Sequence, residues 1–294
     1  MWWRYNEWLG VRFRIHPLLT VFMFLSALTG RFIELIMLFG IVLIHELGHV
    51  AAARHFGWRV RDIVLTPFGG VAVTDEAGSV PAREEAVVAL AGPAMNALMI
   101  AFAFVMGEAG IWTHAWKTYF VQANLTLMLF NLLPITPLDG GKLLHSGLSL
   151  LIPFYRTLKF TAAFSLLASS AIVGAAMSRL GAGGLELNLL LVGSFLMYSN
   201  WTDFKTAPYV FLRFLMHRGK RVAEWTRLGR RVSPITVRGG ERLSAVVRLL
   251  MREKLHLIVI LNRQGAVEAV VPELICTKHY IEQQQNRAVS ELFM

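Results

Sequence analysis

The chain has 294 residues, of which 55% are hydrophobic and 16% are charged, and its mean hydropathy is +0.52. These values exclude an ordinary soluble domain and indicate a membrane protein with several spans. The formal net charge of +10 would suggest nucleic-acid binding in a soluble protein, but here basic residues lie beside apolar segments, where they set orientation and meet anionic lipid. The single cysteine, Cys276, excludes an intramolecular disulfide, so a bound metal would need histidine and carboxylate ligands.

Residues 1–16 mix interfacial aromatic residues with positive charge, a composition typical of the cytoplasmic membrane face: Trp2, Trp3, Arg4, Trp8, Arg12 and Arg14. The apolar stretch that follows, residues 18–32, is short and lacks a small-residue cleavage pattern. We therefore expect this stretch to remain as a first span and the N-terminus to lie in the cytoplasm.

A second apolar stretch, residues 32–53, contains His45, Glu46 and His49. Its length of about 22 residues gives roughly 33 Å of helix, enough to cross a bilayer. Residues four apart share a helix face, so both imidazoles can bind one metal while the carboxylate lies one position round. The pattern is typical of zinc metalloproteases, in which a glutamate deprotonates the attacking water. Ionisable groups inside a span cost about 2.5 kcal/mol or more unless paired or metal-bound, so we favour a metal site over two structural histidines bonded to backbone carbonyls.

Residues 58–74 alternate β-branched side chains and are interrupted by Pro67, Gly69 and Gly70, which predicts a β-hairpin rather than a helix. Open strands are tolerated at membrane depth only where they line a cavity in the protein. The segment is therefore either a re-entrant hairpin beside the metal site or an ordinary interfacial hairpin. In the first case a free strand edge near Phe68, Gly69 and Gly70 would bind an extended substrate.

Residues 84–106 form a third predicted span, in which small residues permit close helix packing. Asn96 in this span is expected to hydrogen-bond across helices rather than to orient a catalytic group.

A fourth predicted span, residues 119–135, runs into a segment with two prolines and two glycines, which break the helix and permit a tight turn. Asp139 emerges from this break as the third ligand that a two-histidine site needs. The alternative is that Asp139 only caps a helix predicted at residues 143–151.

Residues 161–177 and 185–201 complete six predicted spans, a number that keeps both chain ends in the cytoplasm. The region from 205 to 231 is strongly basic, which fits the excess of Lys and Arg on cytoplasmic segments. We therefore divide the chain into a membrane domain (1–204), a basic membrane-proximal linker (205–229) and a C-terminal domain (230–294).

The C-terminal domain is predicted to be a small α/β unit. Strands are expected at residues 233–237, 257–261 and 266–271, an amphipathic helix at 241–255 and a second helix from Pro272 onward. A domain of about 65 residues buries little apolar surface, so we expect it to pair with a second copy and make the protein a homo-oligomer.

Two motifs together resemble the paired signature of the site-2 proteases, a family of zinc intramembrane metalloproteases: H-E-x-x-H at 45–49 and N-x-x-P-x-x-x-L-D-G at 131–140. The resemblance covers about residues 1–205. It implies a polytopic α-helical membrane protein in which His45, His49 and Asp139 bind Zn²⁺. By the same resemblance Glu46 is the general base and Asn131 helps to hold the substrate.

The C-terminal domain resembles a single cystathionine-β-synthase (CBS) motif, a nucleotide-sensing module. Six spans with one such motif resemble the sporulation branch of the family. This implies cleavage of the pro-sequence of pro-sigma-K, inhibition by two membrane proteins (stage IV sporulation protein FA and BofA), and a location in the outer forespore membrane facing the mother cell. Nucleotide-binding CBS motifs often carry Thr or Ser, then Asp three positions later, after the last strand. Here these positions hold Pro272 and Ile275, so ATP is an expectation from resemblance without support from these residues.

A different class of function is a CBS-regulated metal ion transporter, with the same His45, Glu46, His49 and Asp139 lining a transport site. A transporter needs a continuous polar route and often has internal repeats, whereas these spans offer few other ionisable residues and no apparent repeat. Zinc uptake into proteoliposomes would separate the two functions. An inactive scaffold is disfavoured because the base and three ligands are all present.

Overall fold

The structure is a computed structural model that describes residues 7–8, 11–15, 32–66, 69–74, 80–178, 186–282 and 287–292. The chain forms two compact units. The first comprises Met1–Ala77, Arg83–Leu143 and Ile172–Gly193, and the second comprises Gly78–Ala82, Leu144–Ala171 and Ser194–Met294. The predicted boundaries near residues 204 and 229 are thus a separate, sequence-based division that remains a prediction.

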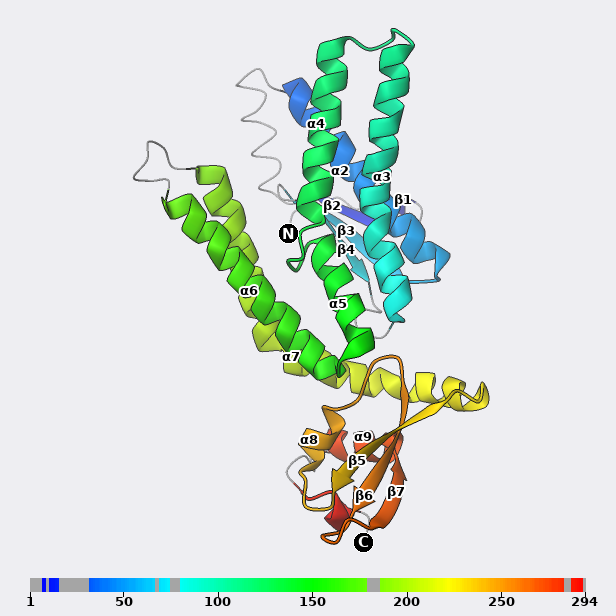
Figure 1. The fold of residues 1–294 in the computed structure, drawn as a ribbon. Helices are drawn as coiled ribbons and strands as arrows, with labels where there is room; N and C mark the ends of the chain where they lie inside the picture. The colour runs from blue at the N-terminus through cyan, green and yellow to red at the C-terminus, as the bar shows by residue number, and fades with distance from the viewer. Residues whose placement is uncertain are drawn as a thin grey trace. The chain divides into compact units, whose positions relative to one another are not determined.

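Three helices lie side by side in the first unit: α2 (Phe32–His55), α3 (Ala82–Glu108) and α4 (His114–Asn131) (Figure 1). Helices α2 and α3 approach closely at Gly48, where an added Cβ would lie 2.5 Å from Met95 Cγ and 2.7 Å from Ala91 O. Glycine at this position therefore permits the close packing of the histidine-bearing helix against its neighbour, as small residues do in membrane helices.

A four-stranded sheet belongs to the same unit, with strand order β1-β2-β3-β4. Strands β3 (Val60–Thr66) and β4 (Gly69–Thr74) pair antiparallel, which confirms the predicted hairpin. The sequence did not predict β1 (Glu7–Trp8) and β2 (Val11–Ile15), and β2 pairs parallel with β3. Strand β4 ends the described sheet and packs beside α2. Phe68 lies outside the described residues.

Helices α6 (Phe154–Ser178) and α7 (Leu187–Arg227) also lie side by side (Figure 1). Helix α6 contains the fifth predicted span, and α7 contains the sixth from Leu187 onward. Lys159 Nζ joins them by donating to Phe204 O at 2.8 Å. Within the described residues, α2, α3 and α6 are long and apolar enough to cross a membrane. The predicted first span lies outside these residues except for its last position.

The C-terminal module (residues 230–294) contains a mixed three-stranded sheet in the order β5-β6-β7, formed by Val232–Arg238, Leu255–Leu261 and Val267–Pro272. Strands β5 and β6 are parallel, whereas β6 and β7 are antiparallel. Helix α9 (Glu273–Ile281) follows the sheet, as predicted.

The helix predicted at residues 241–255 was too long, because α8 spans only Leu243–Val247. Backbone carbonyls beyond it accept hydrogen bonds from other elements instead of continuing the helix. Phe154 N donates to Leu250 O at 3.0 Å, and Arg218 donates to Met251 O at 2.9 Å and Lys254 O at 2.6 Å. These bonds hold residues 250–254, called the junction loop, in an irregular conformation.

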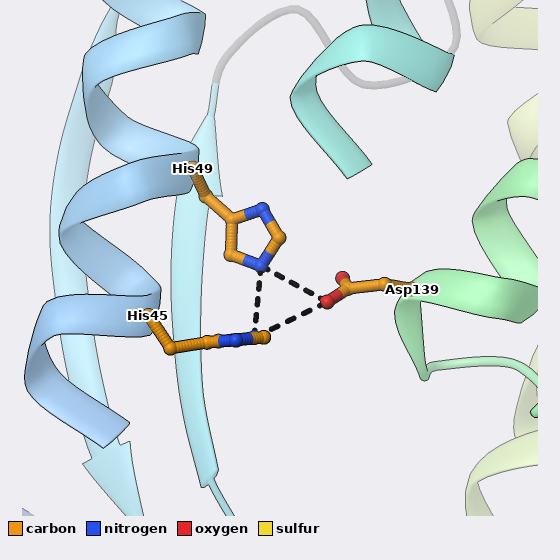
Figure 2. Close-up of side chains that lie close together, drawn as sticks. All are labelled: His45, His49 and Asp139. Carbon is orange, nitrogen blue, oxygen red and sulfur yellow. Dashed lines mark hydrogen bonds and ion pairs between the residues drawn. The ribbon is translucent and has the colours of Figure 1, made fainter. Parts of the chain in front are cut away.

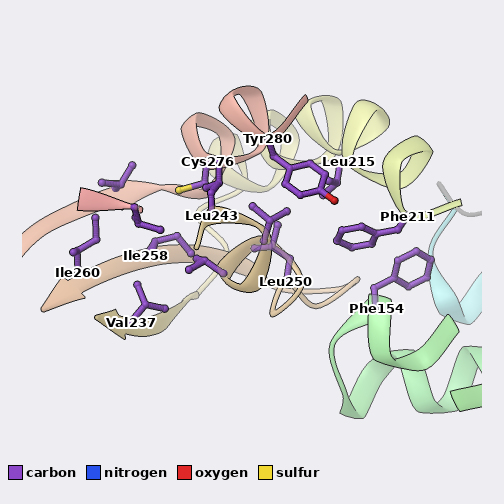
Figure 3. Close-up of a cluster of buried hydrophobic side chains, with 14 of the residues drawn as sticks. Phe154, Phe211, Leu215, Val237, Leu243, Leu250, Ile258, Ile260, Cys276 and Tyr280 are labelled. Carbon is purple, nitrogen blue, oxygen red and sulfur yellow. The ribbon is translucent and has the colours of Figure 1, made fainter. Parts of the chain in front are cut away.

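The core of the C-terminal module extends beyond the module itself. Ile258 and Ile260 from β6 and Leu243 from α8 pack in one cluster with Phe154 of α6 and Phe211 of α7 (Figure 3). The apolar surface that so small a domain lacks is therefore supplied by helices of the same chain. This removes the physical reason for expecting a second copy to complete the core.

The junction loop also makes polar contacts with Val80, which precedes α3, and with Ala82, the first residue of α3. Arg252 is fully buried and donates from Nε and Nη2 to Val80 O at 3.0 and 2.7 Å. Glu253 Oε1 accepts from Ala82 N at 2.9 Å. The C-terminal module is thus bonded to residues 80–82, which belong to the same compact unit, as well as to α6 and α7.

Candidate metal centre

Two histidines from α2 and one aspartate converge on a single point (Figure 2). His45 Nε2 and His49 Nε2 are 3.1 Å apart, and Asp139 Oδ2 lies 3.2 Å from the first and 3.0 Å from the second. All three side chains are buried. The one-turn spacing of the histidines brings both rings to the same face of the helix.

The chain break after α4 delivers Asp139 to the histidines. Helix α4 ends at Asn131, and α5 (Asp139–Leu151) begins at the aspartate itself, four residues earlier than predicted. A Cβ on Gly140 would collide with Leu132 O, and one on Gly141 would lie too close to Thr136 N. The two glycines thus permit the tight return of the chain, and Asp139 does more than cap a helix.

The hydrogen bonds of the two rings show which of their atoms are free to bind a cation. His49 Nδ1 lies 2.7 Å from Val88 O, a carbonyl that can only accept, so Nδ1 carries the proton and Nε2 a lone pair. His45 Nδ1 likewise donates to Asn96 Oδ1, which leaves the His45 Nε2 lone pair facing Asp139.

Three lone-pair-bearing atoms therefore face one another with no proton between them. Asp139 Oδ2 is buried and has no hydrogen-bond donor among the described residues. The lone pairs of the two nitrogens and the carboxylate oxygen repel one another unless a cation lies between them. Zn²⁺, with bonds of about 2.0–2.2 Å to imidazole nitrogen and carboxylate oxygen, fits atoms at these separations and this donor set.

The other oxygen of the aspartate has a separate partner. Lys142 Nζ lies 3.0 Å from Asp139 Oδ1 and is about half exposed. Because the lysine occupies Oδ1, only Oδ2 is directed at the histidines, so the carboxylate offers one ligand atom.

Glu46 is buried and follows His45 directly on α2, but it is not one of the three converging groups. Asn131 lies at the last position of α4, where its Nδ2 donates to Leu127 O at 3.1 Å. Gly69 and Gly70 begin β4.

Two residues of α3 matter more than the sequence indicated. An added Cβ at Gly92 would collide with His49 Nε2 and lie 2.7 Å from His45 Cε1, so the glycine makes room for both rings. Asn96 was expected only to bond across helices. It does so with Asn124 at 3.0 Å, but it also orients His45. A lone amide in an apolar span one helix away from the histidines was the available signal.

Comparison with known proteins gives a consistent result. Residues 33–115 match the sequence profile of peptidase family M50. The chain is 30% identical over 297 residues to stage IV sporulation protein FB of Bacillus subtilis, covering 98% of this chain and 99% of that protein. It is 31% identical over 166 residues to a zinc metalloprotease of Methanocaldococcus jannaschii, covering 52% of this chain and 48% of the relative.

A solved structure, the site-2 protease from Methanocaldococcus jannaschii, has the same fold with a TM-score of 0.54 at 24% identity, over 68% of this chain and 93% of that one. The full-length similarity to the Bacillus protein supports membership of the same family, which similarity of fold alone would not. The chain belongs to peptidase family M50, the site-2 protease family of zinc intramembrane metalloproteases.

Proposed function

We propose that this metalloprotease holds its zinc through His45, His49 and Asp139, uses Glu46 as general base, and cleaves the pro-sequence of a sporulation sigma factor of the pro-sigma-K type. The observation that carries the site assignment is the convergence of three buried lone-pair-bearing atoms within 3.2 Å of one another.

Each residue of the site has a defined task in peptide hydrolysis. Bound zinc supplies a Lewis acid and lowers the pKa of a water molecule towards about 7. Glu46 accepts the proton of the attacking water and passes it to the leaving amine. Asn96 and Val88 O hold the two rings by their Nδ1 protons, and Lys142 holds the carboxylate by Oδ1. Burial of the group keeps bulk water away from the reacting atoms.

The substrate in this proposal lies along the outer edge of β4 as an added strand, near Phe68, Gly69 and Gly70, with Asn131 as a further contact. The edge position of β4 in the described sheet and its packing beside α2 support this. An extended peptide exposes its scissile carbonyl, which a helical segment does not.

A pair of proline variants tests the strand edge. Neighbouring residues in a strand direct their amides to opposite sides, so Val71→Pro and Ala72→Pro remove different N–H groups. The variant that loses an N–H directed at β3 should be misfolded. The variant that loses an N–H directed at the open edge should fold and bind zinc, and its KM should rise about tenfold. If each variant that folds has the KM of the wild type, substrate binding at this edge is contradicted.

The substrate class is supported by the full-length similarity to a sporulation protein. The proposal includes six spans, cytoplasmic termini, a location in the outer forespore membrane, and inhibition by stage IV sporulation protein FA and BofA. Co-expression with pro-sigma-K should give a shortened product, and adding the two membrane proteins should suppress it. An uncut pro-sigma-K beside another membrane protein that is cut would refute the substrate but not the enzyme.

Regulation through the C-terminal module as a CBS-type domain, with ATP as the candidate ligand, is also part of the proposal. A homo-oligomer formed through these domains stays part of it as well, although the module's core is completed within the chain and does not require a second copy. The junction loop supports a regulatory connection. Arg252 binds Val80 O just before α3, and Glu253 binds the N–H of Ala82, the first residue of the helix that also carries Gly92 and Asn96. Cleavage rates of the wild type and of Arg252→Met, each with and without ATP, test this. A response to ATP that is equal in both proteins would count against transmission through the junction loop.

A further inference from the structure

A second buried amide stands behind the one that orients His45. Asn124 lies on α4 and Asn96 on α3, and both are fully buried. Asn124 Nδ2 donates to Phe120 O at 2.9 Å, and Asn96 Nδ2 donates to Asn124 Oδ1 at 3.0 Å. With the bond from His45 Nδ1 to Asn96 Oδ1, these contacts form one continuous chain from the backbone of α4 to a metal ligand on α2.

The direction of every bond in this chain follows from its far end. A peptide carbonyl can only accept, so the Asn124 atom that faces Phe120 O must be the amide nitrogen. The Asn124 oxygen then faces Asn96, which must present its own nitrogen there. Asn96 consequently presents its oxygen to His45, and His45 must carry its proton on Nδ1.

The two histidines differ in how this proton is fixed. His49 donates directly to a backbone carbonyl, Val88 O, which cannot change from acceptor to donor. His45 instead faces a side-chain amide, whose oxygen and nitrogen exchange places when the amide rotates by half a turn. Without a further partner, Asn96 could present its nitrogen to His45 and favour the tautomer whose Nε2 is protonated and unable to bind metal.

We propose that Asn124 is a positioning residue for the zinc site: by fixing the orientation of the Asn96 amide, it selects the His45 tautomer whose Nε2 binds the metal. This inference rests on the proposed ligand set of His45, His49 and Asp139. Helix α4 carries none of the proposed ligands, but through Asn124 it would contribute to metal binding.

The test measures zinc affinity of the purified full-length protein in detergent by competition with a chelator, and the visible spectrum of the Co²⁺-substituted protein. Asn124→Leu removes the bond to Asn96 at similar volume and should weaken zinc binding by about tenfold or more, as loss of outer-shell partners does. The Co²⁺ spectrum should change as well. Asn124→Ala, whose side chain is smaller and cannot clash with its neighbours, should lose the same amount of zinc affinity.

Asn124→Asp is the rescue variant. In a buried site its neutral acid form donates through the hydroxyl to Phe120 O and accepts through the carbonyl from Asn96, so the direction of the chain is kept. Zinc affinity should return to within about threefold of wild type.

Asn200→Leu is the matched control. Asn200 is also fully buried in a long helix and donates to the carbonyl four residues earlier, Leu196 O, at 2.8 Å. This variant should bind zinc as the wild type does. Equal losses in Asn124→Leu and Asn200→Leu, or wild-type affinity in Asn124→Leu, would overturn the inference.

A His45→Ala variant separates this inference from the proposed function. If His45→Ala lowers zinc affinity while Asn124→Leu does not, the ligand set stands and only the role of Asn124 falls. If His45→Ala binds zinc as the wild type does, the proposed ligand set itself is wrong and the inference falls with it.

Discussion

Each of the three proposed zinc ligands has a hydrogen-bond partner on the side that faces away from the other two ligands. His49 is bonded to Val88 O, His45 to Asn96, and Asp139 to Lys142. These bonds fix both ring orientations and leave one carboxylate oxygen facing the rings, which is the usual role of outer-shell contacts around a metal ligand. In the proposed site the chemistry therefore depends on residues outside the ligand set.

Gly92→Ala tests this dependence at the residue that leaves room for the rings. The new Cβ would collide with His49 Nε2, so the imidazoles must move out of position. Zinc content of the purified protein should fall well below one equivalent, and cleavage should fall at least a hundredfold, since small misplacements in active sites cost that much. Metal analysis and cleavage of the same preparation give the answer.

Gly40→Ala is the control for this variant. Gly40 lies on the same helix as the histidines, but a Cβ there meets nothing within 4 Å. It should keep both zinc and activity. Full zinc content in Gly92→Ala would show that the rings tolerate the added methyl group and that the glycine is not needed for the site.

At the scale of elements, α7 and α9 are joined by a buried ion pair. Arg218 of α7 and Glu273 of α9 are each 1% exposed at the side chain and form a double contact at 3.0 Å. The same glutamate accepts from His256 N, so the pair also reaches β6. Breaking one side of such a pair leaves an uncompensated buried charge, at a cost of about 3–5 kcal/mol.

Arg218→Met should therefore destabilise the C-terminal module by about 3–5 kcal/mol, whereas Arg218→Met combined with Glu273→Met should recover much of this loss because no charge stays buried alone. Protease sensitivity of the full-length protein across a denaturant series measures the effect. Equal stability of the single and double variants would show that the buried charge is not the cause.

The elements also show how far the sequence could predict this protein. The H-E-x-x-H spacing and the broken helix before Asp139 were readable because each depends on local geometry. The pairing of β2 with β3 was not, because it joins strands about fifty residues apart and neither pattern requires the other. The excess length predicted for α8 has the same origin: distant donors such as Arg218 take the carbonyls of the junction loop.

The site shows the same limit. His45, His49 and Asp139 could be named from residue type and order, but Gly92 and Asn124 could not. Their importance comes from which atoms lie opposite them in the folded protein.

At the scale of the whole molecule, stability should depend on pH through the C-terminal module. Burial, together with the positive charges of Arg218 and Lys254, lowers the pKa of His256 from 6.5 to about 4. The unfolded chain takes up a proton near pH 6.5 and the folded chain only near pH 4. Neutral His256 therefore contributes about 3 kcal/mol to the free energy of unfolding. This contribution is complete above pH 6.5 and is lost as the pH falls towards 4.

Thermal unfolding of the wild type and of His256→Gln between pH 7.5 and 4.5 isolates this contribution. The variant should be less stable at neutral pH, because His256 accepts from Met251 N and donates to Ser233 O. It should also lose less stability on acidification than the wild type does. Parallel pH profiles for the two proteins would mean that other groups control the acid response.

The most direct test of the central claim is to measure zinc content and cleavage on the same preparations of wild type, Glu46→Gln and Asp139→Ala. The account predicts that the wild type binds one zinc and cuts, that Glu46→Gln binds one zinc and does not cut, and that Asp139→Ala loses both. Loss of zinc in Glu46→Gln, or full zinc in Asp139→Ala, would contradict the assignment of base and ligands.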